Sequence, residues 1–361
     1  MDLFFFLLFC GYSFFLFLIE RRFGVYIHPI TIIIPYSVLI STSYSPDTEA
    51  YIDFYQATNF DLFDFYGDDF AIGFQILTKI LKIFSYGNYS VYMFELTLIN
   101  VSLFMITINL VSKKCINKKI SFLIPLIIYF SYYGIFYNAI VLRAGISLNI
   151  LLLLYVLISI KSRHYVFDYI LYGLLFILAY LFHTSTIIAL LILVVLCLPH
   201  FQRKVYYVLL FVSIIFCYSS VGTSIMNYFY SFLIEHSFVT TNRETENGLD
   251  LLLRYGMTSE IGNVISFKFI FQIILAFIFL NSNAKFKLYK KLFNVYVIGL
   301  LIGSIGIRME TFGRVLDFFT FTSIILLWID YVNSSKLGSL FKFSFVFFLQ
   351  LFFVYRIINP L

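Results

Sequence analysis

The sequence predicts an all-α polytopic membrane protein with about 12 transmembrane helices, an outer amphipathic helix and one larger outer loop. Two observations lead to this fold class. Hydrophobic residues make up 61% of the 361 residues and charged residues only 12%, and the mean hydropathy is +0.94, unlike a soluble domain. Apolar runs of about 17–25 residues, the length a helix needs to cross a bilayer, also recur from Leu3 to Tyr355.

Twelve spans follow from these runs in chain order. They lie near residues 3–19, 27–43, 90–111, 120–138, 141–160, 166–182, 184–199, 205–221, 263–281, 291–307, 311–331 and 339–357. Alternation of the spans places most lysines on one side, including the clusters Lys113–Lys119 and Lys285–Lys291. By the positive-inside rule this side is cytoplasmic, so both termini face outward.

The remaining composition excludes several classes of protein. The sequence pI of 8.9 reflects lysines in short inner loops, without the aromatic or fold context of a nucleic-acid site. The four cysteines form no CxxC pair, so we expect free thiols and no thiolate metal site. Met1-Asp2 lacks the basic start of a secretory signal, so the first span should stay in place.

We expect one integral membrane domain over residues 1–361 with two longer outer segments, 44–89 and 222–262. In the first, Ser45 is a candidate helix cap, with Pro46 at the first helical position. The helical spacing of apolar residues from Phe70 to Phe84 then predicts an amphipathic helix along the outer interface, or a re-entrant hairpin. The second segment is the most polar of the chain, and a lid and a disordered tether explain it equally well.

Arginine shows the opposite distribution to lysine, because six of the ten arginines fall on the outer side. Arg143 opens a span, where a charge costs about 2.5–3.5 kcal/mol on insertion scales. A guanidinium there can bind phosphate oxygens in bidentate fashion. The alternative is an arginine whose side chain extends to the lipid headgroups. Gly145 and Ser147 favour binding, because they leave room beside Arg143.

Two further outer positions are candidates. His183 ends a span beside Thr184 and Ser185, where it is either a hydrogen-bonded structural residue or a base, proton shuttle or sugar binder. Four charged residues, Arg308, Glu310, Arg314 and Asp317, gather where the chain turns back outside. Arg314 and Asp317 are three residues apart, so an internal ion pair is the alternative to a site.

The acids of the first outer loop are less specific. Asp47 and Glu49, with Asp53 behind them, are compatible with a metal-binding triplet, but a solvated surface explains them more simply. The sequence contains no HExxH, no zinc-type spacing, no phosphate-binding glycine loop and no GxSxG. We therefore predict no metal and no cofactor.

Five motifs together resemble the EpsG family of Wzy-type polysaccharide polymerases. In order, they are Tyr44–Tyr51, Asp69–Phe74, Leu142–Ile146, Phe182–Ser185, and Arg314 with Asp317–Phe319. The resemblance covers most of the chain, to about residue 331. One departure is Ala144, where the family often has glutamine.

The resemblance implies an enzyme of the bacterial inner membrane that joins undecaprenyl-pyrophosphate-linked oligosaccharide repeat units on its outer face, in O-antigen, capsule or exopolysaccharide biosynthesis. Its partners would be this lipid-linked substrate, membrane lipid and a chain-length regulator. Arg143 and Arg314 would bind the pyrophosphate, helped by Arg308 or Arg254, with Asp317 in the same motif as Arg314. Asp47 or His183 would activate the acceptor hydroxyl, and Tyr51 and Tyr55 would stack on sugar rings.

Three other functions are compatible with the sequence. An O-antigen ligase uses the same donor with a different acceptor. A flippase or exporter of the lipid-linked sugar would fit the twelve spans, although it needs access from both sides and the inner loops are short. An acyltransferase that uses His183 is disfavoured, since no cofactor-binding constellation faces the cytoplasm.

Overall fold

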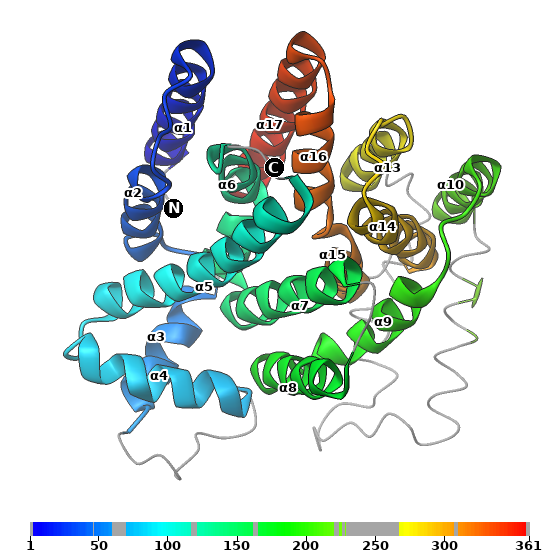
Figure 1. The fold of residues 1–361 in the computed structure, drawn as a ribbon. Helices are drawn as coiled ribbons and strands as arrows, with labels where there is room; N and C mark the ends of the chain where they lie inside the picture. The colour runs from blue at the N-terminus through cyan, green and yellow to red at the C-terminus, as the bar shows by residue number, and fades with distance from the viewer. Residues whose placement is uncertain are drawn as a thin grey trace. The chain divides into compact units, whose positions relative to one another are not determined.

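The computed structural model describes residues 3–45, 47–59, 70–116, 121–161, 165–219, 224–225, 228, 267–306 and 310–358, and within these it leaves the side chains at 116, 267, 310–314, 336 and 356–358 undescribed. Most of these residues are helical, and none of them forms a β-strand (Figure 1). The predicted all-α fold is therefore confirmed. Of the second outer segment, only residues 224, 225 and 228 are described, so a lid and a tether remain equally open.

Every predicted span contains a helix. The described α-helices are α1 (Leu3–Phe23), α2 (Ile30–Ser41), α3 (Thr48–Ala57), α4 (Ile72–Phe84), α5 (Tyr89–Val111), α6 (Leu123–Ile128), α7 (Leu142–Ile160), α8 (Val166–Phe182), α9 (Ala189–Cys197), α10 (Arg203–Tyr218), α13 (Phe267–Leu280), α14 (Lys287–Ile305), α15 (Glu310–Thr320), α16 (Ser323–Asn333) and α17 (Lys336–Ile358). Among them, six segments of 19 to 27 residues are long and apolar enough to cross a membrane, and five more are apolar but shorter. The protein is thus a multi-pass membrane protein.

The chain divides into two compact units. Unit 1 comprises 1–189, 283–289 and 324–361, and unit 2 comprises 190–282 and 290–323. Each unit is described by itself. The prediction of one integral domain stays a prediction.

Unit 1 is built around α7, which packs against α5 and α8, while α5 also packs against α2. The chain reaches α7 through two wide π-helical segments, η2 (Tyr129–Gly134) and η3 (Phe136–Ile140), which are largely buried. Large aromatic side chains with less than 2% exposure, among them Tyr36 and Trp328, fill the interior. A π-helical turn is rare and often marks a functional site, so the approach to α7 is a place to look for one.

Helices α3 and α4, in the segment predicted to lie outside, pack together beside α5 (Figure 1). The predicted amphipathic helix is present, and its buried side combines apolar and polar residues. Phe74 and Leu81 are buried together with Gln75, Thr78 and Lys79, whereas Ile76 and Ile80 are 36% and 43% exposed. The exposed isoleucines suit a helix at a membrane interface, where they can meet lipid.

Lys82 of α4 forms hydrogen bonds with the end of α3. Its ammonium donates to the backbone carbonyls of Tyr55 at 2.7 Å, Gln56 at 3.2 Å and Thr58 at 2.6 Å. These carbonyls end α3, where a helix carries partial negative charge. Burial lowers the pKa of Lys82 from its ordinary value.

Unit 2 contains a close helix crossing between α14 and α15. A Cβ atom at Gly299 would lie 2.1 Å from the Cβ of Phe319, and one at Gly303 would lie 2.6 Å from Leu316. Only glycine allows α15 to approach this closely. The contact fixes the helix that carries Arg314 and Asp317.

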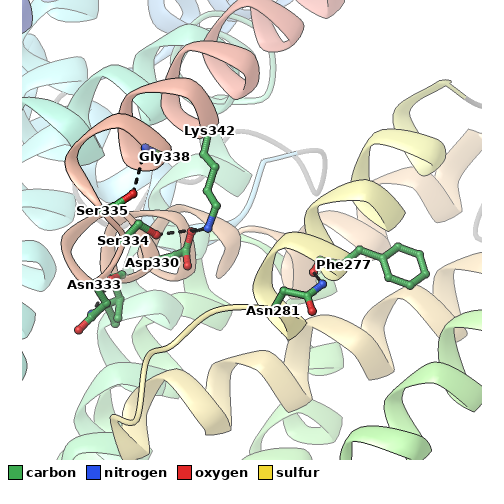
Figure 2. Close-up of polar contacts among 9 residues, drawn as sticks. Phe277, Asn281, Asp330, Asn333, Ser334, Ser335, Gly338 and Lys342 are labelled. Carbon is green, nitrogen blue, oxygen red and sulfur yellow. Dashed lines mark hydrogen bonds and ion pairs between the residues drawn. The ribbon is translucent and has the colours of Figure 1, made fainter.

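Three acids of unit 1, Glu20, Asp168 and Asp330, each have a polar partner. Asp330 pairs with Lys342 at 2.8 Å, and the same ammonium donates to Ser334 at 3.2 Å (Figure 2). Next to this pair, the Ser335 hydroxyl accepts from the Gly338 N–H and caps the start of α17. Asp168 pairs with Lys161, and Glu20 accepts a hydrogen bond from Ser121.

Candidate functional site

The start of α7 is held in place by a close backbone contact. A Cβ atom at position 145 would lie 2.3 Å from the Tyr137 carbonyl oxygen and 2.9 Å from the Asn100 amide nitrogen. Glycine therefore lets η3 pass directly over the first turn of α7. This approach presents Arg143, the second residue of the helix, between η3 and the outer loop.

The Arg143 guanidinium lies over an aromatic surface. Its central carbon is 4.7 Å from the centre of the Phe70 ring, which is cation–π geometry. Phe70 stacks on Phe54 with ring centres 3.9 Å apart, and Phe74 and Tyr51 pack at its sides. We call Tyr51, Phe54, Phe70 and Phe74 the aromatic platform. The aromatic platform contacts the half-buried Arg143 at the start of α7, which is a mostly buried helix.

Tyr51 connects the aromatic platform to α7. Its hydroxyl oxygen accepts hydrogen bonds from Arg143 and from the backbone N–H of Leu142. Burial raises the pKa of Tyr51, Arg143 opposes this change, and the nearby charge of Asp47 adds to it. The phenol therefore stays neutral near pH 7. Asp47, Tyr51 and Arg143 form one electrostatic group.

The loop before α3 is tied to the loop before α7. The Ser45 hydroxyl donates to the Ala139 carbonyl oxygen at 2.7 Å and contacts the Thr48 hydroxyl at 2.9 Å. The prediction that Ser45 caps the helix is thus wrong, because α3 begins at Thr48 and Asp47 takes the cap position. The inward bond of Ser45 explains the difference, and it brings Asp47 to the start of α7.

The three acids near this loop, Asp47, Glu49 and Asp53, are all exposed. Glu49 accepts a hydrogen bond from the Tyr44 hydroxyl at 2.5 Å, and this bond raises the pKa of Tyr44. Among the residues that the structure describes, no three acids, histidines or cysteines are grouped as metal ligands.

His183 marks the end of α8 at the same region. It is half-buried, its N–H donates to Ala179, and its carbonyl accepts from the Thr186 N–H. The Thr186 hydroxyl is 2.6 Å from that of Ser147, one turn after Arg143. The start of α4 also converges here, since a Cβ at Gly73 would lie 2.8 Å from the Leu181 carbonyl oxygen.

A buried amide network lies beneath the start of α7. Asn149 donates to Asn100 at 2.6 Å, and Asn100 donates to Asn138 at 2.5 Å. Asn138 in turn donates to the hydroxyls of Tyr36 and Tyr129 at 3.1 and 3.2 Å. Sequence reasoning missed this network and the role of Phe70. The available signal was the asparagines inside apolar spans, which need partners there.

The other predicted residues belong to unit 2. Arg314 lies on α15, but its side chain is outside the described ones, and Arg254 and Arg308 lie outside the described residues altogether. Asp317 is buried and pairs with Lys268 at 2.7 Å. Its described ionic partner is thus a lysine that sequence reasoning had not considered. The roles of Arg254, Arg308, Arg314 and Asp317 in binding substrate stay predictions.

The fold and this group of residues define a class, namely an all-helical multi-pass membrane protein with an arginine-centred polar site at the ends of α3, α4, α7 and α8. The family model described as the EpsG family matches residues 26–360. The chain belongs to the EpsG family, and it is a membrane protein of polysaccharide biosynthesis. No curated protein and no solved structure matches it.

Proposed function

We propose that the protein is a polymerase that joins undecaprenyl-pyrophosphate-linked oligosaccharide repeat units on the outer face of the bacterial inner membrane. The reaction transfers the growing glycan from its lipid carrier to the non-reducing end of a new lipid-linked unit. The acceptor hydroxyl oxygen attacks the anomeric carbon. The bond from that carbon to the pyrophosphate oxygen breaks, and its electron pair leaves with the lipid pyrophosphate.

The observation that carries this proposal is the setting of Arg143. Its guanidinium is half-buried, lies 4.7 Å from the Phe70 ring centre and bonds to Tyr51. A cation held at the outer end of a helix can stabilise the charge that develops on a departing pyrophosphate without a rearrangement. A lipid pyrophosphate lies at this depth, where the polar headgroups begin.

Two neighbours extend this chemistry. Tyr51 and Tyr55 are 5% and 1% exposed, so neither ring offers much surface to a sugar. The Tyr55 hydroxyl bonds to Ser85, and Tyr51 bonds to Arg143. We assign Tyr51 instead to positioning Arg143. The acceptor hydroxyl must also lose its proton as it attacks, and Asp47 and His183 are the candidate bases. Asp47 has the closer electrostatic link to Arg143, through Tyr51.

A deletion strain tests the proposed function. If the protein polymerises, loss of its gene leaves surface glycan of a single repeat unit, and a plasmid copy restores long chains. Arg143→Ala should fail to restore them, although the variant protein reaches the membrane in normal amount. Lipid-linked repeats that accumulate on the cytoplasmic side would indicate a flippase instead. Long chains without the gene would refute the proposal.

A further inference from the structure

An apolar groove runs between α1 and α2. It is lined by residues of both helices and of the chain just after α2, among them Leu8 and Tyr12 from α1, Pro35 and Val38 from α2, and Thr42 and Ser43 beyond it. Its volume is about 800 Å³. Cavities of about 300–1,000 Å³ typically enclose most of a bound small molecule. The groove is open on its side, since Leu8 and Val38 are 60% and 49% exposed.

Proline shapes the bottom of this groove. Pro35 lies inside α2 and has no N–H, so it cannot donate to the carbonyl of Thr31. The Tyr12 hydroxyl donates to that carbonyl at 3.4 Å. A membrane helix tolerates proline where a neighbouring group satisfies the freed carbonyl. Tyr12 and Pro35 thus close the groove at its inner end, while its walls stay apolar.

The groove lies at the depth of the outer leaflet. Its lining spans Phe5 to Tyr12 on α1 and Pro35 to Ser43 on α2. At 1.5 Å per helical residue these stretches are about 10–12 Å long. The hydrocarbon core is about 30 Å thick, so the groove covers most of the half that one leaflet contributes. Arg21 and Arg22 at the far end of α1 mark the cytoplasmic side.

The chain connects one end of the groove to the Arg143 site. Thr42 and Ser43 line that end, and Ser45, two residues further on, bonds to Ala139 at 2.7 Å. The chain then continues into Asp47 and Tyr51, which interact with each other electrostatically and, through Tyr51, with Arg143. A ligand with its tail in the groove would therefore carry its head toward the arginine.

We propose that this groove holds the polyprenyl chain of the lipid-linked substrate, and the assignment rests on the proposed function. Such a substrate has one apolar chain joined directly to a pyrophosphate. A single apolar groove, joined at Ser43 by a short stretch of chain to the Ser45–Ala139 contact near Arg143, fits that chemistry better than it fits a phospholipid with two acyl chains. The groove accordingly selects the carrier by its chain, and the arginine binds its charged head.

Photocrosslinking of the purified protein in phosphatidylglycerol nanodiscs tests the assignment without requiring turnover. The probe is a polyprenyl pyrophosphate with a diazirine near the head. We expect label on the groove-lining stretches of α1 and α2, displaced by undecaprenyl phosphate. Leu8→Trp should remove at least nine-tenths of it. Leu7→Trp is the matched control, because Leu7 is 45% exposed on the same turn but does not line the groove, and it should label normally.

Label spread over all lipid-facing helices, or displaced equally by added phosphatidylglycerol, would overturn the groove assignment. So would unchanged labelling of Leu8→Trp and of Val38→Trp, the second groove-filling variant. Extension assays separate this result from the proposed function. Labelled groove residues in a protein that extends no lipid-linked repeat would refute the polymerase alone. Active extension with label outside the groove would refute the groove alone.

If the purified protein extends lipid-linked repeats, the length of the lipid carrier gives a second readout. One oligosaccharide repeat is supplied on undecaprenyl pyrophosphate and on a carrier of two isoprene units. Leu8→Trp should lower kcat/KM at least tenfold for the long carrier and leave the short carrier unchanged. An equal loss for both carriers, or no loss for either, would contradict a tail-binding groove.

Discussion

At the residue scale, Arg143 depends on neighbours that fix its direction. It lies 4.7 Å from the Phe70 ring centre, and it donates to the hydroxyl oxygen of Tyr51. Both neighbours belong to the first outer loop, far from Arg143 in sequence. We therefore propose that Arg143 contacts the substrate, whereas Tyr51 and Phe70 position it.

Tyr51→Phe tests this proposal. The change removes one acceptor from Arg143 and keeps the aromatic platform, so the protein should fold while kcat/KM for extension falls roughly ten- to hundredfold. Hydrogen bonds to charged groups contribute about 1.5–3 kcal/mol, which sets this range. Steady-state extension kinetics give the result. Tyr55→Phe is the control, because its hydroxyl bonds to Ser85 at 2.6 Å instead of to Arg143. Equal losses in both variants would contradict the positioning role.

A second residue-scale prediction concerns the Lys268–Asp317 pair. Asp317 is 1% exposed and the pair is 2.7 Å long, so Lys268→Met should destabilise the protein by about 3 kcal/mol. Thermal unfolding in detergent measures the loss. The double variant Lys268→Met with Asp317→Leu should recover most of the stability. If the double variant is stable but does not extend the glycan, the pair has a role in catalysis. If it is stable and extends normally, the pair is structural.

The sequence predicted part of this site. Arg143, Asp47 and Tyr51 belong to motifs that could be recognised in order, and the structure brings these three together. Phe70 and the amide network could not be foreseen, because their partners come from segments far apart in the chain. The inward bond of Ser45 was missed for the same reason, since a local capping pattern carries no information about the Ala139 carbonyl.

At the element scale, the start of α7 is set by the packing of η3 against its first turn. Gly145→Ala would place a Cβ 2.3 Å from the Tyr137 carbonyl oxygen, so backbone must shift. We expect a loss of about 1–3 kcal/mol and a loss of extension activity. Thermal unfolding and extension assays measure the two effects. Gly173→Ala in α8 is the matched control, with no heavy atom within 4 Å, and should be silent. Normal activity in Gly145→Ala would refute this packing.

The helices themselves were the most predictable level. A run of apolar residues fixes a membrane helix strongly, because backbone groups in lipid have no water to bond. The orientation of α4 was harder to predict, because polar Gln75 and Thr78 are buried together with Phe74 while its isoleucines are exposed. A soluble amphipathic helix would expose its polar residues instead.

At the scale of the whole molecule, the charge pattern predicts the topology. Tyr86, after α4, is 95% exposed and is predicted to lie on the outer side, whereas Lys114, after α5, is predicted to lie on the inner side. An introduced Tyr86→Cys should react with an impermeant maleimide in intact cells. Lys114→Cys should react only after permeabilisation, with the parent protein as the background for its own cysteines. The opposite pattern would invert the topology and remove Arg143 from the outer face.

The central claim is that Arg143 serves an outer-face polymerase, and extension of a defined lipid-linked repeat by the purified protein tests it most directly. The wild-type protein should produce a ladder of products from undecaprenyl-pyrophosphate-linked repeats, also with a chelator present. Arg143→Ala should lower the rate by at least a hundredfold, and Arg143→Lys should restore little, because a lysine lacks the bidentate fork. A normal ladder from Arg143→Ala, or no ladder from the folded wild-type protein, would contradict the account.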